Sequence, residues 1–138
     1  LCLGYRGAAD GVSEMLATGV DLVEIARVER AVNQYGDRFL KRVFTENEIL
    51  YSRGRVAELA ARFAAKEAVS KALGVGLRAI ARDGIYWKDV EVTGDRRGKP
   101  IVRLFGRAAE RAEELGLTEW SISLTHTKEH AIAFVVAL

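Results

Sequence analysis

Glu67 occupies a position where a carboxylate needs a partner. It lies in an Ala-rich segment, residues 56–73, and on a helical wheel it stands beside Phe63 and Ala64, within the apolar stripe. Burying an unpaired ion costs on the order of several kcal/mol, so this carboxylate must be compensated. Three solutions fit the sequence: Glu67 is protonated, it pairs with Lys71 one helical turn later, or it ligates a metal ion.

Asp21 is the second carboxylate of interest, because it closes a segment of alternating residues, 16–21, that predicts a short strand. With Glu24 it resembles a capping box, in which Asp21 would cap the helix that follows. It is also suited to a hard cation, since magnesium in proteins is held by one or two carboxylates together with phosphate oxygens and water. Spacing alone does not bring Asp21 beside Glu67, so both interpretations stay open.

The remaining candidates are weak when they are taken singly. His126 ends a predicted strand between two threonines, where a histidine is more often a surface residue than a catalyst. Gly98-Lys99-Pro100 is ordinary turn chemistry that contains a cation. The sequence contains no P-loop, dinucleotide fingerprint, Ser/His/Asp set or zinc-ligand spacing.

Length and composition limit the classes of protein to consider. The chain has 138 residues, of which 49% are hydrophobic, with 21 basic and 19 acidic side chains, so one globular domain is expected. Cys2 is the only cysteine, which excludes a disulfide scaffold. The longest apolar run, 131–138, is far shorter than the roughly 20 residues that cross a bilayer, and the first residues lack the apolar region of a signal peptide. We therefore expect a cytoplasmic protein without a membrane partner and, because its charges are balanced and interspersed, without a nucleic-acid partner.

A small set of helices and strands must position these residues. Residues 1–14 show no clear period, and we expect a tag, an extension or a processing remnant there, with the domain formed by residues 15–138. Thr45 and Glu48 form a capping box that starts a helix, and Gly74 stops the Ala-rich helix. The predicted order is a strand up to Asp21, helices over 23–35, 45–54 and 56–73, a loop over 74–84, strands over 85–93 and 101–104, a helix over 106–115, and strands over 120–125 and 130–138. This order predicts an α+β domain with a mainly antiparallel sheet packed against the long Ala-rich helix.

Five blocks of the sequence, in this order, resemble a known family. They are residues 18–25 (TGVDLVEI), 62–74 (RFAAKEAVSKALG), 87–92 (WKDVEV), 98–100 (GKP) and 121–127 (SISLTHT). Together they are similar to the holo-acyl-carrier-protein synthases, the small bacterial type of 4′-phosphopantetheinyl transferase. The resemblance covers residues 17–138, and its most specific part is the second block.

The resemblance implies transfer of 4′-phosphopantetheine from coenzyme A to a serine of apo acyl carrier protein, with release of adenosine 3′,5′-bisphosphate. A serine hydroxyl then attacks a phosphorus of the pyrophosphate, and a divalent cation neutralises charge on the leaving group. Asp21 and Glu67 match the family's magnesium carboxylates, with manganese as a substitute, and Lys71 matches a lysine near the pyrophosphate. Glu67 is favoured as the base for the serine proton, directly or through a water on the cation, and Asp21 is the alternative.

The same resemblance assigns binding surfaces and an assembly. With Lys71, the residues that would line the coenzyme A site are Arg62, Lys66, Gly98, Lys99, Pro100, His126 and Thr127. Arg27 matches the arginine that docks the acidic carrier protein, and the basic residues that could assist it are Arg30, Arg38 and Arg42. The family fold assembles as a homotrimer with active sites between subunits, which we expect here. The loop over 75–84, with Arg78 and Arg82, departs from the family pattern.

Two other functions are compatible with the sequence. A non-enzymatic module on the same fold could bind an acyl carrier protein or an acidic peptide, but such a module has no need of Asp21, Glu67 and Lys71 together. A different magnesium-dependent phosphotransferase could use the same scaffold. Binding of coenzyme A with magnesium would distinguish the transferase from the binding module, because ligands that bind the folded state stabilise it.

Overall fold

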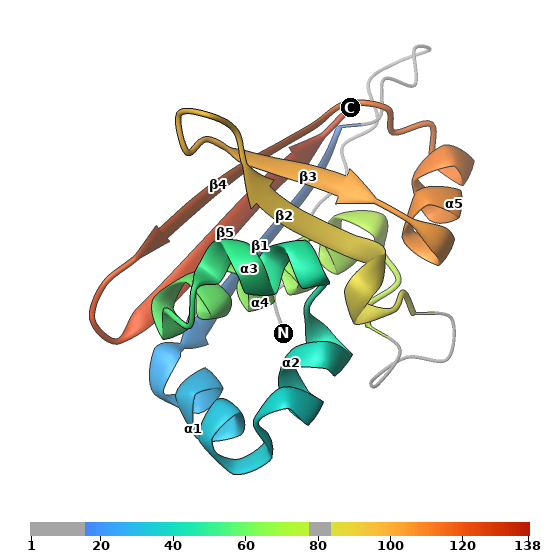
Figure 1. Ribbon diagram of the computed structural model, residues 1–138. Helices are drawn as coiled ribbons and strands as arrows, with labels where there is room; N and C mark the ends of the chain where they lie inside the picture. The colour runs from blue at the N-terminus through green and yellow to red at the C-terminus, as the bar shows by residue number, and fades with distance from the viewer. Residues whose placement is uncertain (1–15, 78–83) are drawn as a thin grey trace.

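A computed structural model describes residues 16–77 and 84–138 of the chain (Figure 1). The helices are α1 (Ile25–Tyr35), α2 (Asp37–Val43), α3 (Glu46–Ser52), α4 (Val56–Leu73) and α5 (Gly106–Glu114), with a 3₁₀ helix η1 (Trp87–Asp89). The strands are β1 (Ala17–Glu24), β2 (Val90–Gly94), β3 (Pro100–Leu104), β4 (Trp120–His126) and β5 (His130–Ala137). These elements confirm the predicted α+β class. The predictions for residues 1–14, Arg78 and Arg82 lie outside the described residues.

Helix α4 forms the centre of the domain. It is rich in alanine, and most of its surface is buried against other elements. Strand β1 comes so close to it that a Cβ atom on Gly19 would lie 1.9 Å from the carbonyl oxygen of Ala68. Only glycine fits at this crossing, because any larger residue would overlap the helix backbone. The long helix is confirmed over the predicted residues, and Gly74 ends it with a φ of 70°. No helix in the described ranges is long and apolar enough to cross a membrane.

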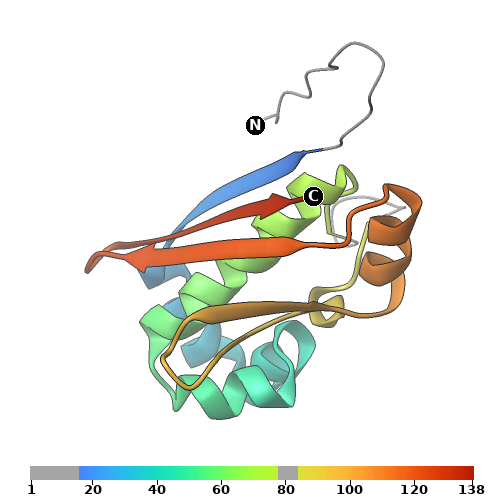
Figure 2. The ribbon, with the colours of Figure 1, turned by 90° about the horizontal axis from the view of Figure 1, so that it is seen from above.

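Two antiparallel sheets pack against α4 (Figure 2). The larger has the order β1-β5-β4, so β5 lies between two edge strands. Its alternate residues, among them Ala131, Ala133 and Val135, are buried on the side of α4. The smaller sheet is the hairpin of β2 and β3, which lies on the β4 side of the larger sheet. The predicted antiparallel arrangement is confirmed, although it is divided between two sheets.

Two local predictions were wrong because tertiary contacts override the local pattern, and one short helix was missed. Strand β1 continues to Glu24 because it pairs with β5 along its whole length, so Asp21 lies within the strand and does not cap α1. Helix α2 was not predicted, since it is short and follows directly on Gly36, whose φ of 55° ends α1. Residues 85–89 do not belong to the predicted strand, because η1 intervenes and only residues 90–94 pair with β3.

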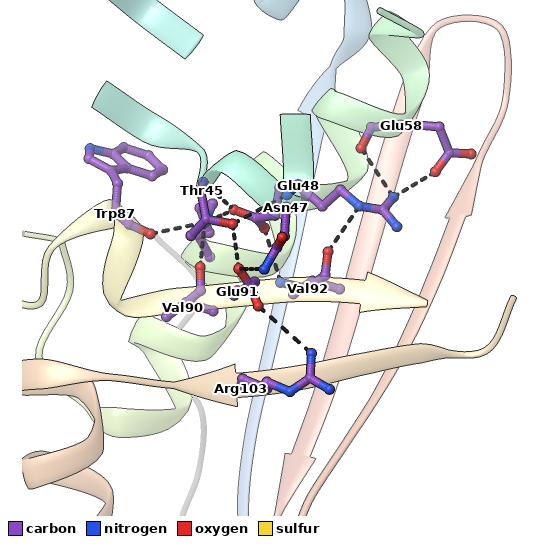
Figure 3. Close-up of polar contacts among 11 residues, drawn as sticks. Thr45, Asn47, Glu48, Glu58, Trp87, Val90, Glu91, Val92 and Arg103 are labelled. Carbon is purple, nitrogen blue, oxygen red and sulfur yellow. Dashed lines mark hydrogen bonds and ion pairs between the residues drawn. The ribbon is translucent and has the colours of Figure 1, made fainter. Parts of the chain in front are cut away.

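An ion pair lies fully buried between α3 and α4. The ammonium of Lys66 lies 2.7 Å from Glu48 Oε1, and neither side chain is accessible to solvent. The ammonium also donates hydrogen bonds to the carbonyl oxygens of Trp87, at 3.0 Å, and of Val90 (Figure 3). Burial lowers the pKa of Lys66, and the negative charge of Glu48 opposes that shift. Lys66 therefore joins α4 to α3 and to the start of β2.

The Glu48 side chain also takes part in capping the N-terminus of helix α3. One of its oxygens accepts a hydrogen bond from the Thr45 N–H at 2.9 Å, and the Thr45 hydroxyl accepts one from the Glu48 N–H, which confirms the predicted capping box. Its second oxygen accepts from the Val92 N–H of β2 at 3.0 Å. Glu91 accepts from the Thr45 hydroxyl at 2.6 Å, so two carboxylates connect α3 with β2 (Figure 3).

Candidate active site

The structure brings Asp21, Glu67 and Lys71 together at the edge of the larger sheet; we call these three residues the carboxylate cluster. Asp21 lies on the same side of β1 as Gly19, the side that packs on α4. The Lys71 ammonium lies 3.1 Å from Asp21 Oδ1 and donates to the Val20 carbonyl oxygen at 2.9 Å. Of the alternatives that the sequence left open for Glu67, a pair with Lys71 is not the one observed, because the lysine bonds to Asp21.

Burial disfavours the ionised form of both carboxylates of the cluster, and the charge of Asp21 adds to this effect at Glu67. Burial is the largest cause that raises the pKa of Asp21, and the hydrogen bond and charge of Lys71 oppose it. Burial also raises the pKa of Glu67, and the negative charge of Asp21 raises it further, against the charges of Lys71 and Arg27. Lys71 and Arg27 therefore supply the positive charge that offsets the two carboxylates.

A magnesium ion fits the donor set of this cluster. Among residues 16–77 and 84–138, no three His, Cys, Asp or Glu side chains are grouped so as to hold a metal ion. Magnesium does not require such a group, because it is commonly held by one or two carboxylates with phosphate oxygens and water as its other ligands. Asp21 and Glu67 would supply the two carboxylates. A substrate with phosphate groups would have to complete the site.

The raised pKa of Glu67 predicts how the stability of the cation-free protein changes with pH. A carboxyl group whose pKa is higher in the folded state stabilises that state only while it is protonated, and this contribution is lost as the pH rises through the folded-state pKa. We therefore expect Glu67→Gln to raise the melting temperature at pH 7 in the presence of EDTA. The difference should disappear below 4.5, the ordinary pKa of a glutamate. Differential scanning fluorimetry over this pH range measures it, and a variant less stable than the wild type at pH 7 would contradict the argument.

A second group of predicted site residues lines a pocket of about 360 Å³, which we call the Arg62 pocket. It is formed by Tyr51, Glu58, Ala61, Arg62, Gly98, Pro100, Leu124, Thr125 and His126. The Arg62 guanidinium is held by Glu58, at 2.6 Å, by the Val92 carbonyl oxygen, at 3.1 Å, and by the face of the Tyr51 ring. The pocket combines a fixed cation with an aromatic ring, a histidine and a glycine-containing turn, which suits a phosphorylated nucleotide.

The carboxylate cluster and the Arg62 pocket lie on opposite sides of the same chain. Nine residues of α4 separate Arg62 from Lys71, which is about two and a half turns, so the two side chains leave the helix in opposite directions. Asp21 lies on β1 and His126 on β4, the two edge strands of the sheet. Two interstrand spacings, about 10 Å in all, separate these strands. Within one chain, the carboxylate cluster and the Arg62 pocket are therefore separated by about this distance or more.

Three residues predicted to contact coenzyme A have other contacts. The prediction for Lys66 is wrong for this structure, because its ammonium is fully buried and bonded to Glu48. Lys99 lies beside the Arg62 pocket with an exposed side chain, and its N–H donates to Asp95. The Thr127 hydroxyl accepts hydrogen bonds from backbone N–H groups of the β4–β5 turn. Lys66 was mistaken for a site residue because a buried lysine and a phosphate-binding lysine look alike in a sequence.

Sequence reasoning missed the partners of Arg62. Tyr51 and Glu58 were not singled out, although the four-residue spacing from Glu58 to Arg62 is the spacing of an ion pair along a helix. That signal was present in the sequence. The stacking of Arg62 on Tyr51 had no comparable signal, because α3 and α4 contribute one residue each.

The four arginines predicted to dock a carrier protein are all exposed on α1 and α2. They are Arg27, Arg30, Arg38 and Arg42. Arg38 and Arg42 border a hollow of about 720 Å³ whose walls include Phe63 and Trp87, with ring centroids 4.7 Å apart. This surface thus combines positive charge with partly buried aromatic rings. An acidic helix with apolar side chains would be complementary to it.

Comparison with known proteins shows the family of this chain. The model of the 4′-phosphopantetheinyl transferase superfamily matches residues 17–135. A holo-[acyl-carrier-protein] synthase of Herpetosiphon aurantiacus is 52% identical, over 90% of this chain and 99% of the relative. Among solved structures, the Helicobacter pylori holo-[acyl-carrier-protein] synthase in complex with coenzyme A is similar with a TM-score of 0.78 and 30% identity, over 88% of this chain and 99% of that one. The corresponding synthase of Bacillus anthracis has a TM-score of 0.68 and 34% identity, over 88% of this chain and 94% of that one.

The match to the family model includes every residue of the carboxylate cluster and of the Arg62 pocket. A match to the family model over residues 17–135 and a relative that is 52% identical along nearly its whole length leave one assignment: this chain belongs to the 4′-phosphopantetheinyl transferase superfamily.

Proposed function

We propose that the protein is a holo-acyl-carrier-protein synthase, which transfers 4′-phosphopantetheine from coenzyme A to a serine of apo acyl carrier protein. The observation that carries this proposal is the meeting of Asp21 and Glu67 beside Lys71, although 46 positions separate the two acids in the sequence. Its relatives include proteins named for this activity, and one of them was crystallised with coenzyme A. We also propose a cytoplasmic location for the protein.

In this reaction the serine oxygen forms a bond to the β-phosphorus of coenzyme A. The bond from that phosphorus to the bridging oxygen breaks, and adenosine 3′,5′-bisphosphate leaves with the electron pair. Magnesium, held by Asp21 and Glu67, would neutralise the charge that develops on the phosphates, and manganese is expected to substitute for it. Lys71 would place its ammonium against a phosphate oxygen. Glu67 would accept the serine proton, directly or through a water on the cation.

Intact-mass spectrometry of a carrier protein tests this function directly. An apo acyl carrier protein is incubated with the protein, coenzyme A and magnesium, beside a sample with EDTA. We expect the carrier mass to increase by one phosphopantetheine in the first sample only. No increase, with a folded protein that binds the carrier, would instead favour a binding module on this fold.

The proposal includes a homotrimer with shared active sites, and the exposed face of the larger sheet supports it. On the side away from α4, Val20 is paired with Phe134 and Leu22 with Ile132, and all four are exposed. Phe134 alone is 45% exposed. A contiguous apolar patch of this kind is typical of a surface that another protein chain covers. A second copy that covers it could contribute residues to the active site of the first.

We expect Phe134→Glu to dissociate this assembly and to reduce transfer in parallel, because a charge at the centre of an apolar interface cannot be solvated there. Light scattering coupled to size-exclusion chromatography measures the mass, and circular dichroism checks the fold. Leu50→Glu is the matched control, since Leu50 is 67% exposed on α3 and lies away from this face. It should leave both the mass and the activity unchanged.

Mixed assemblies test whether the active site is shared. Coexpression of a Glu67→Gln chain with a His126→Ala chain should restore part of the transfer that each variant lacks alone, since some interfaces would then combine an intact cluster with an intact pocket. If the coexpressed pair were no more active than the separate variants, the shared site would be wrong even if Phe134→Glu did dissociate the assembly.

Carrier docking is proposed for the basic surface of α1 and α2. Arg30→Glu should raise the KM for the carrier at least tenfold and leave the KM for coenzyme A within twofold. A charge at the rim of an interface acts mainly on the rate of association, and salt screens its effect. Arg30 is a sharper probe than Arg27, whose charge also acts on Asp21 and Glu67. Steady-state kinetics at low and high salt measure the effect. Equal changes in both KM values would contradict docking at this surface.

A further inference from the structure

Lys71 stands where the carboxylate cluster requires a cation. Its ammonium is 3.1 Å from Asp21 Oδ1 and 2.9 Å from the Val20 carbonyl oxygen, and its charge also lowers the pKa of Glu67. The carboxylate of Asp21 is only 18% exposed, so this contact is largely shielded from water. Lys71 is thus positioned as the counterion of both acids.

When Arg27 is counted with the carboxylate cluster, the charges balance without a metal ion. The two carboxylates contribute two negative charges, and Lys71 and Arg27 are the cations that act on both of them. A divalent cation that entered this site alone would leave it with an excess of two positive charges, at a cost that partial burial increases. A pyrophosphate diester brings one negative charge on each phosphate. Cation and pyrophosphate arriving together would keep the site neutral.

We propose that Lys71 is an exchangeable counterion, which occupies the carboxylate cluster when coenzyme A is absent and moves to the pyrophosphate when the divalent cation binds. The cation and coenzyme A then bind cooperatively, because each removes the cost of binding the other. This inference rests on the proposed function, in which Asp21 and Glu67 hold the cation. It adds that the cluster has low affinity for the cation until coenzyme A is present.

The position of Lys71 allows this exchange. It lies in the last turn of α4, and its side chain is 32% exposed, so the ammonium has free space on one side. A lysine has four rotatable side-chain bonds and binds phosphate as a compact point charge, which lets it change partners without movement of the helix. Lys66 shows the opposite arrangement five residues earlier, since it is enclosed completely and has no such freedom.

Manganese binding to the protein without a carrier tests the proposal, with the free hydrated ion followed by electron paramagnetic resonance. We expect the wild type to bind Mn²⁺ weakly alone and at least tenfold more tightly with coenzyme A. Lys71→Met should bind Mn²⁺ alone at least tenfold more tightly than the wild type, and coenzyme A should then add much less. By linkage, Mn²⁺ must tighten coenzyme A binding to the wild type by the same factor.

Three control variants distinguish the charge at Lys71 from a general effect of surface charge and from failure of the metal site itself. Lys71→Arg keeps the charge and should retain the weak binding of Mn²⁺ alone. Lys88→Met removes an exposed charge on η1 and should match the wild type. Mn²⁺ affinity of Lys71→Met equal to that of the wild type would overturn the counterion proposal. Glu67→Gln that still binds Mn²⁺ normally with coenzyme A would instead overturn the metal site on which the proposal rests.

Discussion

Replacing Glu67 with alanine reduces phosphopantetheine transfer by about 10³-fold or more, a loss at the upper end of what one catalytic acid or base supplies. The residue is expected to hold the cation and to accept the serine proton, so its removal affects two functions at once. Steady-state transfer at saturating coenzyme A and carrier measures the effect. The melting temperature should not fall, because Glu67 is half-buried and its ionised form is disfavoured by burial and by Asp21.

Glu113→Ala is the matched control for this prediction. Glu113 is an exposed acid on α5, outside the carboxylate cluster and the Arg62 pocket. Its replacement should leave transfer within twofold of the wild type. An active Glu67→Ala enzyme would show that the cation and the base lie elsewhere, and Asp21 would become the first residue to examine.

Replacing Lys66 with methionine destabilises the protein by about 3–5 kcal/mol, the usual cost of breaking a buried ion pair from one side. Methionine has a similar length but leaves Glu48 charged and enclosed, and it removes the donor for two carbonyl oxygens. Urea denaturation followed by circular dichroism measures the change in the free energy of unfolding. Any loss of activity should follow the loss of folded protein, because Lys66 has no access to substrate.

The double variant Lys66→Met with Glu48→Gln separates the charge from the packing. Glutamine removes the unpaired charge, although its single side-chain oxygen can accept from the N–H of Thr45 or from that of Val92 and not from both. We expect it to recover a large part of the stability lost in Lys66→Met, a non-additive result that coupled residues give. Strict additivity of the two substitutions would mean that the ion pair contributes no coupling.

The elements with strong local signals were predicted well. The Ala-rich helix begins and ends where its composition and Gly74 indicated, and the Thr45–Glu48 capping box forms as predicted. Helix α2 and the end of β1 were missed for the same reason, since neither is determined by its own residues. Strand β1 extends to Glu24 because β5 is its partner, and that pairing joins residues more than 100 positions apart.

Within the candidate site, too, some residues could be predicted from the sequence and others could not. Glu67 was found because an acid in an apolar stripe is a visible anomaly, and the family resemblance then paired it with Asp21. Position in the sequence did not distinguish Lys66 from Lys71, which lie in one block but on different sides of α4. Only the fold shows that the first is enclosed against Glu48 and the second faces Asp21. The separation of the Arg62 pocket from the carboxylates is also a property of the fold alone.

Gly19 sets the spacing of the carboxylate cluster. Its missing side chain lets β1 rest directly on α4 at Ala68, and Asp21 follows two residues later on the same face of the strand. Even one methyl group at position 19 would force the strand and the helix apart, because the atom it meets belongs to the helix backbone. Asp21 would then move away from Glu67 and Lys71 together. Gly19 binds no ligand, but its lack of a side chain sets how far Asp21 lies from Glu67 and Lys71.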